Sequence, residues 1–173
     1  MKEEFINKEI WMLTFGASFQ RAYAYTKDAT EDVKQDFKKN TSAFIEKMLP
    51  EYKNGNVSDE NHIDNIKKVS DNSKQYSEIF KGGQINFGIA QKMLNLYLKY
   101  QWCLGTIAEP PHFPVDRIIQ QKLNEQAKIE GILKLELLPW TQFKDENHYC
   151  KVINHARLLK KESPAQLELR LFQ

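Results

Sequence analysis

Residues 86–104 are apolar on nearly every side of a helix, and this feature constrains the fold more than any other. The polar exceptions within the stretch are Gln91, Lys92, Asn95 and Lys99. A glycine pair at 82–83 precedes the stretch and Gly105 follows it, and glycines in these positions interrupt helices. A helix that is hydrophobic all round is usually buried. The sequence therefore predicts a central buried helix over 86–104.

The rest of the chain also favours helices. Apolar spacing predicts them over about 6–23, from a Thr30 cap to Pro50, from Ser58 or Asp59 to a break at 71–73, over 115–124, over 143–160 and from Ser163 onward. Residues 131–138 fit a short strand or a helix end equally well. At 173 residues, 41% of them apolar, the chain has the size and core of one domain. We expect residues 1–173 to form a single compact all-α domain of about six or seven helices around 86–104.

Several classes of protein do not fit this sequence. No apolar run approaches the roughly 18 residues of a membrane span, and the first residues lack the pattern of a secretion signal. Cys103 and Cys150 are too few for a disulfide framework, and His148 and His155 have no further ligand at metal spacing. We expect a cytoplasmic protein with no membrane partner, no cofactor and no metal, whose oligomeric state the sequence leaves open.

Charge is distributed unevenly along the chain. The net charge is +2, but residues 81–122 carry five basic and two acidic residues. A local positive field of this kind attracts polyanions even when the net charge is small. We therefore expect an anionic partner, if there is one, to bind at this middle segment.

Two short motifs carry a family resemblance. Residues 87–92, Phe-Gly-Ile-Ala-Gln-Lys, and residues 113–116, Phe-Pro-Val-Asp, resemble the helix-hairpin-helix DNA glycosylase superfamily. In that family a Pro-Gly-Val/Ile-Gly-x-Lys stretch opens one helix and a Pro-Val-Asp or Ala-Val-Asp stretch opens another. Gly88 matches the first glycine and Ala90 stands at the second. Lys92 matches the amine nucleophile of the members with lyase activity, and Asp116 matches the catalytic aspartate.

Chain geometry allows this lysine and aspartate to meet. A helix from Lys92 to its end at 104 rises about 18 Å, and the ten-residue connection 105–114 spans up to roughly 33–36 Å when extended. The connection can therefore return along the helix and place Asp116 beside Lys92. Burial and the neighbouring Lys99 would favour the neutral amine of Lys92, which would attack C1′ of a damaged nucleotide. Asp116 would stabilise positive charge on the sugar.

A glycosylase must also hold a base outside the DNA stack. The candidate substrate-binding residues are Gly88, Ala90, Lys99, Trp102, His112 and Phe113, with Tyr97 as a further stacking surface. Other interpretations explain the same residues without chemistry, since a lysine at a helix edge and an aspartate in a first helical turn form ordinary salt bridges. The alternatives are a noncatalytic helical protein–protein interaction module and a nucleic-acid binder without catalytic activity.

Overall fold

The computed structural model describes residues 1–159 and 162–172, which form helices joined by loops. Among these residues, seven α-helices have nine residues or more: α1 (Lys2–Phe19), α2 (Glu31–Glu46), α4 (Asp59–Asn72), α5 (Phe87–Cys103), α6 (Arg117–Glu130), α7 (Glu146–Leu158) and α8 (Pro164–Phe172). Shorter helices are α3 (Leu49–Tyr52), η1 (Ser73–Ile79) and η2 (Trp140–Gln142). In this part of the chain β pairing is limited to an isolated bridge between Tyr25 and Phe80. The predicted all-α fold with six or seven main helices is confirmed.

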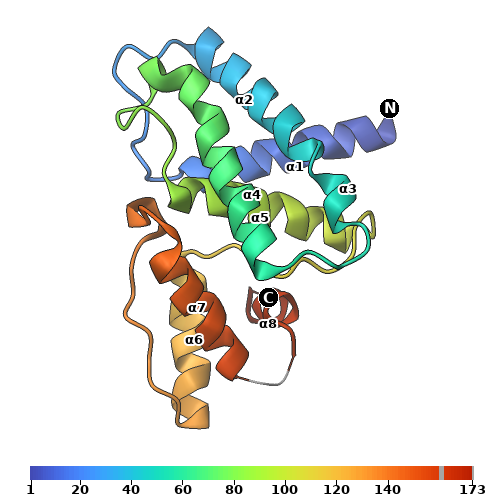
Figure 1. Ribbon diagram of the computed structural model, residues 1–173, viewed down its shortest axis with the longest axis vertical. Coiled ribbons are helices and arrows are strands. Elements are labelled where there is room, and N and C mark those ends of the chain that lie inside the picture. The colour runs from blue at the N-terminus through green and yellow to red at the C-terminus, as the bar shows by residue number, and fades with distance from the viewer. Residues whose placement is uncertain (160–161, 173) are drawn as a thin grey trace.

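Helix α5 lies at the centre of the molecule, as its apolar surface predicts. Met93, Leu94 and Leu98 are completely inaccessible to solvent, and most other residues of α5 are buried. Helices α1 and α4 pack directly on α5. Figure 1 shows α1 to α5 grouped in one half of the molecule and α6 to α8 in the other. The chain after α5 connects these two halves.

Side-chain caps fix where several helices begin. Asn86, Ser58 and Asp116 each accept a hydrogen bond from a backbone N–H in the first turn of the helix that follows. These oxygens satisfy donors that a helix start leaves without a partner. The predicted cap at Ser58 and the break at 71–73 are confirmed, since α4 ends at Asn72.

Other predicted boundaries were wrong by several residues. Helix α1 starts at Lys2 and ends at Phe19, and α6 continues to Glu130. The helix predicted from Thr30 does stop before Pro50, at Glu46, and Pro50 itself lies in the first turn of α3, where a missing N–H costs nothing. Residues 132–138 form neither a strand nor a helix end. The predicted end of the 143–160 helix at residue 160 lies outside the described residues.

Within the described ranges, no helix combines the length and the apolar character that crossing a bilayer demands.

Candidate functional site

Lys92 and Asp116 meet where α5 faces the start of α6. Lys92 Nζ lies 3.3 Å from Asp116 Oδ2, and only 7% and 14% of the two side chains are exposed. The other carboxylate oxygen of Asp116 accepts a hydrogen bond from Ile119 N at 3.0 Å. Asp116 therefore caps α6 and pairs with Lys92 at the same time. The return of the connection along α5, expected from chain length alone, places the two groups in contact.

Trp140, on η2, covers the amine of Lys92. Lys92 Nζ lies 3.7 Å from the centroid of the Trp140 ring, a distance at which a cation is attracted to the ring face. Burial lowers the pKa of Lys92, and Asp116 opposes this change by stabilising the ammonium. The net direction is downward, so the neutral amine forms more readily here than on an exposed lysine.

Lys99 lies elsewhere on α5 and has its own partners. Its Nζ is 2.8 Å from Glu168 Oε2 of α8 and 4.4 Å from the centroid of the Phe172 ring. Burial raises the pKa of Glu168, against the effect of Lys99. The prediction that Lys99 favours the neutral form of Lys92 finds no support, because the lowered pKa of Lys92 has burial as its cause. Lys99 instead joins α5 to α8.

The two motif residues that precede Lys92 are packed inside the protein. A Cβ added to Gly88 would lie 1.6 Å from the carbonyl oxygen of Trp140, and Gly88 N donates to Phe143 O at 3.1 Å. The missing side chain thus allows the η2 segment to lie directly against α5. Ala90 is completely inaccessible to solvent. In this structure both residues serve the packing of α5.

The predicted stacking surfaces lie in the core or at its edge. Phe113 is 1% exposed, and Tyr97 stacks on Trp11 with ring centroids 4.0 Å apart. Trp102 is half-buried against the core. These positions place little aromatic surface beside the amine other than the ring of Trp140. Five surface hollows in the described part of the chain are each lined by residues other than Lys92 and Asp116.

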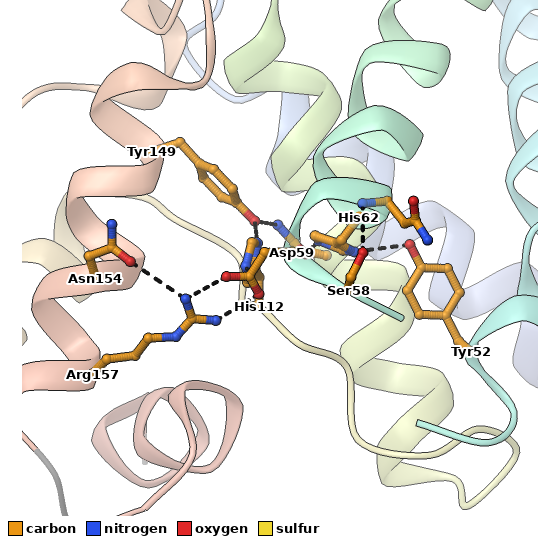
Figure 2. Close-up of polar contacts among 10 residues, drawn as sticks. Tyr52, Ser58, Asp59, His62, His112, Tyr149, Asn154 and Arg157 are labelled. Carbon is orange, nitrogen blue, oxygen red and sulfur yellow. Dashed lines mark hydrogen bonds and ion pairs between the residues drawn. The ribbon is translucent and has the colours of Figure 1, made fainter. Parts of the chain in front are cut away.

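A second polar cluster, which sequence reasoning missed, crosses the interior (Figure 2). We call it the histidine network, and its members are Tyr52, Asp59, His62, Asn95, His112, Tyr149 and Arg157. It joins α3, α4, α5, α7 and the connection after α5 through hydrogen bonds of 2.6 to 3.1 Å. His62 and His112 are 0% and 2% exposed.

Groups that can only donate or only accept a hydrogen bond indicate the direction of the bonds in this network. Asn95 Oδ1 can only accept, so His62 Nε2 donates to it and His62 Nδ1 accepts from Tyr52 Oη. Asn95 Nδ2 donates to Tyr149 Oη, which leaves the hydroxyl to donate to His112 Nδ1. His112 Nε2 then donates to the carboxylate of Asp59. These directions are those of two neutral histidines, each in one tautomer.

The ionisation of the network agrees with these directions. Burial lowers the pKa of His62 to about 3 and that of His112 to about 4. Asp59 receives two hydrogen bonds from Arg157, at 2.6 and 2.8 Å, and its pKa falls to about 2, chiefly because of them. Only this outer ion pair is charged at neutral pH. The hydrogen-bond path between the two imidazoles runs through the amide of Asn95, so the network is better suited to holding helices together than to moving protons.

Sequence spacing gave no sign of this network. His112 was interpreted as a candidate substrate-binding residue, because its partners Tyr149 and Asp59 lie 37 and 53 residues away in the sequence. In the structure the ring of His112 is enclosed by Tyr149 and Asp59 and does not contact Lys92. The only sequence signal was the placement of Asn95 within an otherwise apolar helix.

No protein-family model, curated protein or solved structure matches this chain. Within residues 1–159 and 162–172, no three histidine, cysteine or acidic side chains lie close enough together to hold a metal ion.

Proposed function

We propose that this chain is a DNA-binding protein that acts on damaged or abasic nucleotides with Lys92 as its amine nucleophile. One observation carries the proposal. Lys92 Nζ and Asp116 Oδ2, which occupy the two positions that the glycosylase resemblance assigns to catalysis, lie 3.3 Å apart although 24 residues separate them. The lowered pKa of Lys92 supports the same role, because only the neutral amine is nucleophilic.

The chemistry uses both side chains. Lys92 first transfers a proton from its ammonium to Asp116, which leaves a neutral amine. Nζ then adds to the C1′ aldehyde carbon of a ring-opened abasic nucleotide, and one proton moves from Nζ to the aldehyde oxygen. The proton held by Asp116 then passes to this hydroxyl, which leaves as water, and a protonated C=N bond joins Lys92 to the sugar beside the restored carboxylate. Where an intact base departs, the carboxylate of Asp116 stabilises the positive charge that develops on the sugar.

The ring of Trp140 controls access to this amine. It covers Nζ in the structure, so a nucleotide reaches Lys92 only after the η2 segment moves away from the start of α5. This segment belongs to the stretch 131–145, whose only regular structure is the three-residue η2. A displaced Trp140 would also supply an aromatic face for an extruded base.

Borohydride trapping on a duplex with one abasic site, and on a duplex with 8-oxoguanine, tests the proposal. Reduction fixes the C=N bond, and peptide mapping by mass spectrometry locates the modified residue. We expect a covalent adduct on Lys92 in the wild type and in Lys67→Ala, a surface control. The adduct should be absent in Lys92→Arg, which keeps the charge beside Asp116, and in Lys92→Ala. An adduct on the N-terminal amine alone, or none on the wild type, would overturn it.

A second candidate function is a noncatalytic interaction module, and a specific observation favours it. The amine of Lys92 already has a carboxylate and an aromatic ring as partners, which is a complete structural role. DNA binding that weakens with salt but gives no adduct would indicate a nucleic-acid binder without chemistry, because phosphate contacts release counterions. The absence of both DNA binding and adduct would leave the interaction module.

A further inference from the structure

A groove with an aromatic floor lies between α1 and α2, far in sequence from Lys92. Its volume is about 800 Å³, and its apolar lining consists of Trp11, Met12, Phe15, Gly16, Phe19 and Tyr25. We call it the α1–α2 groove. Trp11 and Phe15 are almost completely buried, while Met12 is 61% exposed at the edge. Met12 and the half-buried rings of Phe19 and Tyr25 therefore offer apolar surface that the rest of the described chain leaves partly uncovered.

Gly16 keeps the middle of this groove open. It lies inside α1, where glycine is less favourable than alanine by about 1 kcal/mol. A Cβ built on Gly16 would meet no atom within 4 Å. Close packing within the described structure therefore does not require a glycine here. Space above Gly16 is instead available to an occupant from outside.

The rim of the groove is positively charged. Lys8 on α1 and Lys38 and Lys39 on α2 contribute to its lining, and none of the described carboxylates does. Lys8 also reaches Glu4 on its own helix at 3.5 Å, but both side chains are at least 70% exposed, so this pair is weak. An apolar floor between lysines is complementary to an object with one apolar face and acidic edges.

We propose that the α1–α2 groove binds an amphipathic helix with an acidic polar face, supplied by another protein. Such a helix places residues spaced at i, i+3, i+4 and i+7 on the apolar floor. Its Glu and Asp side chains then face Lys8, Lys38 and Lys39. The apolar stripe on α1 continues beyond the groove to Phe5, which is 64% exposed, so a longer helix gains further contact. This inference is independent of the function proposed for Lys92.

Fluorescence anisotropy with designed peptides tests the proposal on the full chain. The probe is a labelled helical peptide of about 18 residues with a leucine stripe and a glutamate polar face. A second peptide keeps the leucines and replaces every glutamate with lysine. We expect saturable binding of the acidic peptide and at least about tenfold weaker binding of the basic one, since the rim discriminates by charge.

Two variants locate the binding. Gly16→Leu fills the groove from a helix position that has free space, and the paired change Lys38→Glu with Lys39→Glu reverses the rim charge. Each should weaken binding of the acidic peptide about tenfold or more, with an unchanged circular dichroism spectrum. The charge-reversal control is Lys151→Glu, an exposed position on α7, which should bind like the wild type.

Several outcomes would overturn the inference. These are no binding of the acidic peptide, equal binding of the two peptides, or binding that Gly16→Leu leaves unchanged. A wild-type dimer in sedimentation that Gly16→Leu dissociates would show that a second copy fills the groove instead. Binding of single-stranded DNA that displaces the acidic peptide, and that Gly16→Leu abolishes, would instead assign the groove to nucleic acid.

Discussion

Gln91 holds both backbone groups of Val115. Its Nε2 donates to Val115 O at 2.7 Å, and its Oε1 accepts from Val115 N at 3.1 Å. Because Lys92 follows Gln91 and Asp116 follows Val115, this pair of bonds fixes the register that brings the carboxylate to the amine. The connection between α5 and α6 is thus bound to α5 at Val115, the residue that precedes Asp116.

Gln91→Leu should therefore disturb the site as well as the fold. It leaves both backbone groups of Val115 buried without partners, which costs about 2–4 kcal/mol of unfolding free energy. Urea unfolding measures this loss, and borohydride trapping should fall with it. The control is Gln121→Leu at an exposed position on α6, where we expect a change within about 0.5 kcal/mol. Equal stability of the two variants would contradict the role of the two hydrogen bonds between Gln91 and Val115.

Asp116→Asn separates the two roles of Asp116, which caps α6 and provides a negative charge beside Lys92. Asparagine also caps helices well, so α6 should keep its start, while the ammonium of Lys92 loses its partner. We expect the pKa of Lys92 to fall further below 10.5, because Asp116 raises it in the wild type. Carbon-13 NMR of the lysine Cε signal measures that pKa directly. An unchanged titration of Lys92 would argue against the coupling.

The same variant makes a prediction about stability. A lysine whose folded pKa lies below its unfolded pKa leaves the folded chain with fewer bound protons, so stability rises with pH up to about 10.5. The unfolding free energy of Asp116→Asn should therefore increase between pH 7 and pH 10 more than that of the wild type. Urea unfolding at the two pH values is the test, and parallel curves would count against the prediction.

The histidine network predicts loss of stability in mild acid. Histidine in the unfolded chain titrates near pH 6.5, whereas folded His112 and His62 have pKa values of about 4 and about 3. Below pH 6.5 the unfolded chain binds protons that the folded chain does not, so the unfolding free energy falls as the pH drops to about 4. For His112 alone the total is on the order of 3 kcal/mol.

His112→Gln tests this assignment. The amide retains partners for Tyr149 and Asp59 but has no proton to gain, so the unfolding free energy should depend less on pH between 6.5 and 4. Asp59 changes the unfolding free energy only below that range. Its pKa is about 2 in the folded chain and near 4 in the unfolded chain, so its stabilising contribution is lost as the pH falls below about 4. An identical pH slope in the variant and the wild type would exclude His112 as the source.

Two glycine-to-alanine changes should act in opposite directions. Gly88→Ala places a Cβ 1.6 Å from the carbonyl oxygen of Trp140, so the η2 segment must shift, at a cost of about 2 kcal/mol or more. Gly16→Ala adds a methyl group in open space within α1 and should stabilise the protein by about 0.5–1 kcal/mol. Thermal unfolding compares them. A tolerated Gly88→Ala would refute the tight contact.

Local chemistry made much of the fold predictable. The continuous apolar surface of 86–104 required burial, and caps such as Ser58 and breakers such as Gly105 act on their immediate neighbours. The Lys92–Asp116 contact could also be predicted as possible. The connection 105–114 is long enough, when extended, to return along the helix from its end to Lys92. The short helix α3 around Pro50 was missed, because the penalty of proline depends on its position in a helix turn.

Partners distant in sequence could not be predicted in this way. Nothing near His62 in the chain indicates Asn95, and nothing near Lys99 indicates Glu168. Gly88 resembled a residue for substrate approach, and only the tertiary structure showed the carbonyl of Trp140 in that space. The sequence alone determined the helices and which of them is central, because these depend on short-range periodicity and burial. The tertiary structure decided which polar groups pair inside the protein, since a buried group takes whatever partner the packed helices bring within hydrogen-bond distance.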